Sequence, residues 1–175
     1  MRYSWMIVLL VTMACHEQNK NKVSPAELVK SREIKRVTEG EILQGGTILG
    51  EEIMQVLDSI IQNKASGDKM DCEFSKWVEI DSLESSYQTD IRYVNSSSTE
   101  KVELEFQLLD AYQYSLENDL APRASVQKLD AKTVLYAYPI DESSTIYTHC
   151  LDSTGRTQAQ IWSLKMPIKL IINRL

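Results

Sequence analysis

Apolar residues recur at helical spacing between Thr38 and Gln62, and this pattern predicts a long helix. Gly45, Gly46 and Gly50 interrupt the apolar stripe, and each can destabilise a helix by up to about 1 kcal/mol relative to alanine. Two interpretations stay open. Either the helix keeps its glycines so that another backbone or a ligand can approach closely, or it begins only after Gly46.

Two further helices are predicted from the same periodicity. After a break at residues 66–68, apolar side chains fall largely on one face over residues 70–87, and Cys72 lies inside this helix close to the edge of that face. Residues 102–118 carry a third buried stripe. Residues 38–118 are therefore predicted to be mainly helical.

Strand patterns surround and follow the third helix. Residues 89–94 alternate and are rich in β-branched and aromatic side chains, which predicts a strand before that helix. After Pro122, four strand-like stretches form two predicted hairpins, with turns at 130–132 and 152–155. The four stretches are residues 125–129, 133–140, 145–151 and 156–166. Helices first and an antiparallel sheet last predict an α+β fold.

The start of the chain has the layout of an export signal. Arg2 precedes an apolar run over residues 5–11 that is too short to remain as a membrane-spanning helix, and compact residues then lead to Cys15. This arrangement resembles a bacterial lipoprotein box, although Thr12 stands where that box usually has Leu or Val. The resemblance implies a signal peptide at 1–14 and a lipid on the Cys15 sulfur. The alternative is an ordinary signal peptide with an incidental cysteine.

The segment after Cys15 predicts a tether followed by one domain. Residues 15–37 are expected to hold the lipidated cysteine and a flexible leash, because their first part is too polar to bury enough apolar surface for ordering. Residues 38–175 have the size of one domain. We expect a periplasm-facing protein of the bacterial cell envelope, anchored to the membrane through lipid. His16, where aspartate would favour inner-membrane retention, favours the outer membrane.

Composition and charge narrow the function classes. The chain is 43% hydrophobic and 25% charged, which is typical of a soluble protein with a core. Its formal charge of −6 becomes −7 without residues 1–14, where Arg2 is the only charged residue. No basic patch is present, so nucleic acid is not an expected partner. The sequence also lacks a metal-binding histidine pair, a phosphate loop and a serine elbow, so we expect no enzyme activity and no metal site.

Several short stretches occur in an order and spacing that carry a family resemblance. They are Asp71-Cys72, Asp81-Ser82-Leu83, Tyr87, Ile91-Arg92-Tyr93-Val94, Leu109-Asp110-Ala111-Tyr112, Thr133 to Ile140 and Ile161 to Pro167. Together they resemble the bacterial PAS-like domains that bind c-type haem, over about residues 40–168. The resemblance implies a PAS-like antiparallel β-sheet packed against N-terminal helices.

The haem-attachment motif of that family is altered in this sequence. Its Cys-x-x-Cys-His motif corresponds to residues 147–151, where Tyr147 replaces the first cysteine and Leu151 replaces the ligand histidine, so only Cys150 is kept. Cys72 matches a helix cysteine that is the other axial ligand in some relatives. The resemblance thus implies a degenerate member without covalent haem. A remaining pocket would be lined by Cys72, Trp77, Tyr136, Tyr138 and Tyr147.

Three interpretations of Cys72 and Cys150 compete. We place two separate buried thiols, acting as small apolar residues, first. A disulfide follows closely, because an exported compartment is oxidising and lipidation of Cys15 leaves an even number of cysteines. Ligation of a non-covalent haem by Cys72 with His149 comes third. A lone histidine on a strand is more often a surface or hydrogen-bonded residue than a ligand.

The predicted function is a membrane-tethered, non-enzymatic module in the periplasm that senses or binds a small ligand or an envelope protein. The candidate site residues are Cys72, Tyr147, His149 and Cys150, and no cofactor is expected. One alternative is a redox sensor or electron-transfer protein that holds haem without covalent attachment. A third possibility is a structural envelope lipoprotein with a filled core.

Overall fold

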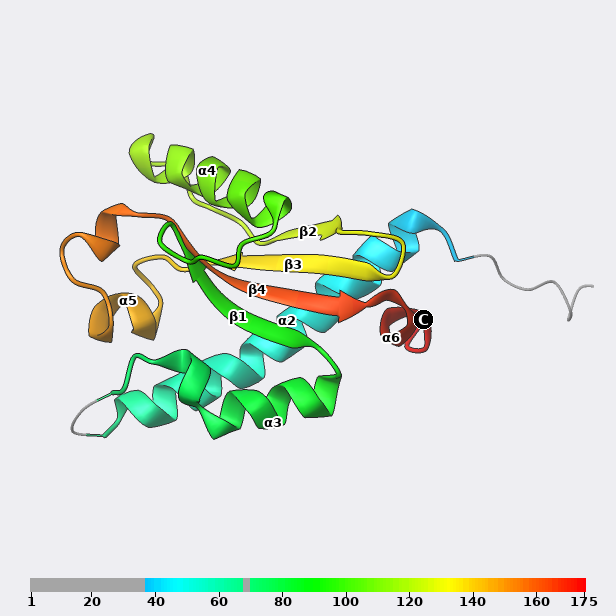
Figure 1. Ribbon diagram of the computed structural model, residues 1–175, viewed down its shortest axis with the longest axis horizontal. Helices are drawn as coiled ribbons and strands as arrows, with labels where there is room; N and C mark the ends of the chain where they lie inside the picture. Colours follow the sequence, from blue (N-terminus) through cyan, green and yellow to red (C-terminus); the bar gives the residue numbers. More distant parts are fainter. Residues whose placement is uncertain (1–36, 68–69) are drawn as a thin grey trace, which may run out of the picture. The chain divides into compact units, whose positions relative to one another are not determined.

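The computed structural model describes residues 37–67 and 70–175 (Figure 1). Its first helix begins at a capping box, in which Thr38 and Glu41 each bond to the backbone N–H of the other. The Glu41 backbone N–H donates to Thr38 Oγ1 at 3.2 Å, and the Thr38 N–H donates to the Glu41 carboxylate at 2.8 Å. Helix α2 therefore spans Glu39–Ala65 and keeps all three glycines. The alternative in which the helix begins after Gly46 is wrong.

Gly50 allows α2 to lie against the sheet. A Cβ atom at this position would stand 2.4 Å from Cγ of Tyr136, far inside van der Waals contact. The Tyr136 ring thus occupies the space that any side chain at residue 50 would need. The close approach predicted for the glycines occurs at Gly50, but its partner is an aromatic side chain of the core and neither a backbone nor a ligand.

The second helix is shorter than predicted. Residues 70–73 have no regular structure, a short 3₁₀ helix η1 covers Phe74–Lys76, and the α-helix α3 spans only Val78–Tyr87. The Glu73 N–H donates to Asp71 Oδ1 at 3.0 Å, and a local turn of this kind competes with helix formation. The prediction that Cys72 lies inside a helix is therefore wrong.

Four strands form one antiparallel sheet in the order β1-β4-β3-β2. The strands are β1 (Asp90–Asn95), β2 (Ser125–Lys128), β3 (Thr133–Pro139) and β4 (Gln160–Pro167), and helix α4 (Glu103–Glu117) follows β1. The strand and third helix predicted on either side of the Ser-rich loop are confirmed. So is the first hairpin, in which Val126 lies opposite Tyr136.

The second predicted hairpin does not form. Thr145–His149 is a short helix, α5, in which Ser144 Oγ accepts the N–H of Ile146 at 3.3 Å. A second 3₁₀ helix, η2 (Gly155–Thr157), precedes β4. Strand β4 pairs with β3 and β1 instead of with residues 145–151. The β-branched residues that suggested a strand at 145–151 include Ile146, which is fully buried in the helix.

Helices cover both faces of the sheet (Figure 1), and the fold is α+β as predicted. Helix α2 contacts α3, α5 and the C-terminal α6 (Ile168–Ile172), as well as β2 and β3, while α4 contacts β3 and β4. The larger core lies on the α2 face. Its fully buried members include Ile53, Leu57, Ile61, Tyr136, Ile146, Trp162, Leu164, Met166 and Ile171. A smaller core lies under α4, with Val94, Leu108, Leu109, Tyr112, Leu135, Ala137 and Ile161.

A buried carboxylate fixes α4 to the sheet. The Glu105 side chain is completely buried, and its carboxylate accepts hydrogen bonds from Ser163 Oγ at 2.6 Å and from the Val102 N–H at 2.8 Å. Its charge is balanced by Arg92 Nη2 at 3.1 Å and Lys165 Nζ at 3.6 Å. This group joins the first turn of α4 to β1 and β4.

Residues 37–175 form one unit of the chain. The predicted signal peptide, Cys15, His16 and nearly all of the predicted tether lie outside the described residues. None of the helices that the structure describes combines the length and apolar character needed to traverse a bilayer.

Candidate functional site

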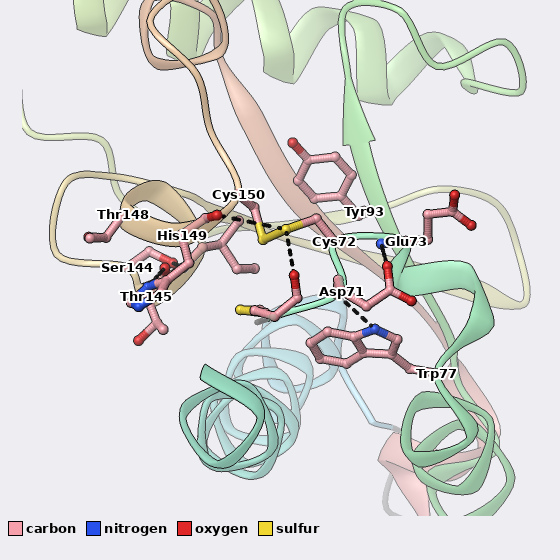
Figure 2. Close-up of a disulfide and its surroundings, with 12 residues drawn as sticks. Asp71, Cys72, Glu73, Trp77, Tyr93, Ser144, Thr145, Thr148, His149 and Cys150 are labelled. Carbon is pink, nitrogen blue, oxygen red and sulfur yellow. Dashed lines mark hydrogen bonds between the residues drawn. A yellow bond between two sulfur atoms is a disulfide. The ribbon is translucent and has the colours of Figure 1, made fainter. Parts of the chain in front are cut away.

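Cys72 and Cys150 are joined by a disulfide, with their Cα atoms 5.6 Å apart (Figure 2). Cys72 comes from the irregular segment before η1, and Cys150 is the residue that ends α5. The bond links parts of the chain that are 78 residues apart. Of the three interpretations of these cysteines, the disulfide is the one the structure contains, and the preferred one, two separate thiols, is wrong.

The segment that carries Cys72 is held by contacts on both sides of the cysteine. The Trp77 indole N–H donates to the Asp71 carbonyl at 3.1 Å, and the indole is only 3% exposed. Cys72 Sγ lies 3.9 Å from the His149 carbonyl oxygen, a contact rather than a hydrogen bond because a disulfide sulfur carries no hydrogen. The disulfide and the Trp77 anchor together fix the position of this segment.

The side chains of His149 and Tyr147 contact groups other than the disulfide sulfurs. The exposed His149 ring places Nδ1 at 3.0 Å from the Thr145 carbonyl oxygen, within α5 (Figure 2). The half-buried Tyr147 ring lies 5.2 Å from the guanidinium carbon of Arg156. Tyr147 and Arg156 line a hollow of about 650 Å³ beside the C-terminal end of α4. Only Cys72 and Cys150, among the four predicted site residues, come together through their side chains.

Three of the five side chains expected to line one pocket, Cys72, Trp77 and Tyr147, line three different hollows of the part of the chain that the structure describes. Trp77 and Tyr136 are 3% and 1% exposed and belong to the larger core. Burial raises the pKa of the Tyr136 phenol well above its usual range, because the charged phenolate would lose its hydration there. Cys72 and Tyr147 line separate hollows. Tyr136 is covered by α2, whose Gly50 lies directly against its ring.

A groove of about 490 Å³ runs beside the outer edge of β1, and we call it the β1 groove. It is lined by the disulfide-bound segment, by α3, by β1 and by Trp162 of β4. The lining residues are Cys72, Glu73, Phe74, Ser75, Ile80, Asp81, Glu84, Ile91, Arg92, Tyr93 and Trp162. Its size is within the range of about 300–1,000 Å³ that is usual for ligand sites.

The groove combines an apolar interior with carboxylates. The Phe74 ring lies 5.0 Å from that of Tyr93 and 5.2 Å from that of Trp162, in edge or tilted contacts. Asp81 and Glu84 project from α3, three residues apart and so on one side of the helix. This arrangement can hold an apolar group beside a positive charge.

Cys72, Cys150 and His149 are not arranged to hold a haem like the one bound by the family that the sequence resembles. Axial ligation by cysteine needs a thiolate, and covalent attachment needs a free thiol, but both Cys72 and Cys150 are consumed by the disulfide. The only histidine nearby, His149, is exposed and directed at a carbonyl of its own helix. Within the described part of the chain, no cluster of three or more His, Cys, Asp or Glu side chains is arranged to hold a metal ion.

Asp81 and Glu84, the carboxylates that α3 brings to the β1 groove, were not among the predicted site residues. The available signal was the spacing of Asp81 and Glu84, which places them on one helix face immediately before a strand.

Comparisons of the chain with protein-family models, curated proteins and solved structures give no match. The functional interpretation therefore rests on the geometry described above.

Proposed function

We propose that this chain is a lipid-anchored, non-enzymatic binding module of the bacterial cell envelope, with a PAS-like scaffold that has lost covalent haem. It would bind a small ligand or an envelope protein in the β1 groove, on the periplasmic side of the membrane, with the outer membrane favoured. The observation that carries the proposal is the disulfide between Cys72 and Cys150.

The disulfide supports both the location and the lack of haem. Disulfides persist in oxidising compartments such as the periplasm and are rare in the bacterial cytosol, which agrees with an exported chain. The bond also joins the two positions that the family resemblance assigns to haem, Cys72 as an axial ligand and Cys150 as an attachment cysteine. In this proposal, the covalent bond between the two sulfurs takes the place of their contacts with haem.

The position of the cross-link supports a role for the β1 groove. Cys72, Glu73 and Phe74 form one wall of the groove, and the disulfide fixes this wall to the end of α5. A preorganised wall lowers the entropy lost when a ligand is bound. The antiparallel sheet with a long helix across one face agrees with the resemblance to PAS-like domains.

A haemin titration tests the proposal against the alternative of non-covalent haem. We expect the oxidised chain, residues 16–175, to leave the Soret absorbance of added haemin as it is in buffer, because no thiolate is available. The reduced chain and a reduced Cys72→Ser variant show whether any binding depends on that sulfur. A saturable Soret shift in the oxidised chain that disappears in His149→Ala would contradict the proposal and favour a haem protein.

A further inference from the structure

The outer edge of β1 has one open backbone position between two that are capped. Antiparallel pairing with β4 turns the backbone groups of alternate residues outward, here Ile91, Tyr93 and Asn95. The Ile91 N–H donates to Glu84 Oε1 at 2.7 Å, and the Asn95 N–H donates to Ser98 Oγ at 3.0 Å. The Tyr93 N–H and carbonyl have no hydrogen-bond partner within residues 37–67 and 70–175. Such a position can accept another strand.

The β1 groove lies along the same edge. Its lining includes Ile91 and Tyr93, which pack toward the α2 face, and also Arg92, which points to the opposite face. The groove therefore follows the strand edge rather than only one face of the sheet. A chain segment lying in it would pass directly beside the open backbone groups of Tyr93.

The uncompensated charge in the groove is negative. Lys76 is ion-paired with Glu73, and the Arg92 guanidinium is held by carboxylates outside the groove. Asp81 and Glu84 make no ion pair with a cation in the part of the chain that the structure describes. The groove thus complements a ligand with positive charge and an apolar centre.

We propose that the β1 groove binds an extended segment of a partner protein, which pairs with β1 as an added strand and carries Lys or Arg two residues to either side of an apolar residue. This proposal rests on the binding function proposed above and names the class of ligand. The residue opposite Tyr93 exchanges both backbone hydrogen bonds with it and shares its face, so its apolar side chain enters the groove. Residues two positions away share that face and bring their charges toward Asp81 and Glu84.

Peptide titrations followed by two-dimensional amide NMR test this proposal on residues 16–175. The probe is acetyl-Lys-Thr-Val-Thr-Lys-amide, compared with the same peptide carrying Glu in place of Lys and with one N-methylated at Val. We expect saturable binding of the basic peptide with a downfield shift of the Tyr93 amide proton. Asp81→Asn combined with Glu84→Gln should weaken binding about tenfold, as expected for two exposed ion pairs. The matched control Glu117→Gln with Glu142→Gln, at the other hollow, should leave it unchanged.

The outcomes separate this proposal from the function on which it rests. Equal binding of the acidic and basic peptides, or no weakening on N-methylation, would overturn the added strand with its cationic side chains. If a neutral naphthylamine dye shifts the groove amides while no peptide does, this proposal is overturned and the binding function stands. If neither the dye nor any peptide shifts those amides, both are overturned.

Discussion

Replacing both Cys72 and Cys150 by serine is expected to lower the free energy of unfolding by about 4.5 kcal/mol, the loop-entropy estimate for a cross-link of this span. The bond closes a loop between residues 78 positions apart, so its loss frees the unfolded chain over more than half of the described unit. In the folded state, the η1 segment also loses its covalent link to α5. Urea denaturation of residues 16–175 measures the difference.

The reduced wild-type chain is the control for this pair of substitutions. Reductant should bring the wild-type urea midpoint close to that of the double serine variant and leave the variant unchanged. A double variant that remains within about 1 kcal/mol of the oxidised wild type would contradict a structural role for the bond, because it would lie below the usual range for native disulfides.

Substitution of Glu105 by alanine is expected to destabilise the fold by about 3 kcal/mol or more, because it removes one partner of a buried ion pair. The fully buried carboxylate balances Arg92 and Lys165, and it accepts hydrogen bonds from Ser163 and from the first turn of α4. Without it, Arg92 and Lys165 share, among the described residues, only the more exposed Asp90 carboxylate as a counter-ion. Urea denaturation at neutral pH provides the measurement.

Glu103 offers a matched control for Glu105. It lies in the same first turn of α4 but is exposed, and within the described residues its carboxylate accepts a hydrogen bond only from Gln107, four residues later. Glu103→Ala should therefore change the free energy of unfolding by less than about 0.5 kcal/mol. Similar losses for the two variants would show that helix propensity, and not the buried charge network, accounts for the effect at Glu105.

The parts of the fold that sequence predicted well are those with long, regular hydrophobic patterns. The apolar stripe over 38–62 and the alternation over 89–94 became α2 and β1, because in each the side chains on one face are buried together. The order of helices and strands along the chain predicted the α+β class, which the structure confirms. The disulfide between Cys72 and Cys150 was among the predicted interpretations, but the preferred one kept the thiols separate.

The errors arose where a few local contacts outweigh periodicity. A hydrogen bond from the Glu73 N–H to Asp71 and the indole anchor of Trp77 delay the start of α3, so Cys72 lies outside the helix. The stretch 145–151 reads as a strand from its β-branched residues, but the Ser144 cap and the burial of Ile146 favour a single turn of helix. Neither feature has a repeating pattern that sequence periodicity could detect.

The candidate site was only partly predictable for a related reason. Tyr147 and His149 were chosen from the altered haem motif, yet in α5 their side chains face Arg156 and Thr145 rather than the disulfide. The β1 groove depends on two elements that lie far from that motif in the sequence, namely the edge of β1 and the acidic side of α3. Its existence follows from packing and could not be read from one stretch of sequence.

Intact-mass spectrometry of the mature protein from a bacterial envelope, alkylated with and without prior reduction, tests most directly the claim that a disulfide has replaced the haem contacts. We expect a chain that begins at a lipid-modified Cys15, takes up no alkylating reagent before reduction, takes it up at Cys72 and Cys150 afterwards, and carries no porphyrin. Alkylation of both cysteines without reductant, or porphyrin retained on the chain, would contradict the claim.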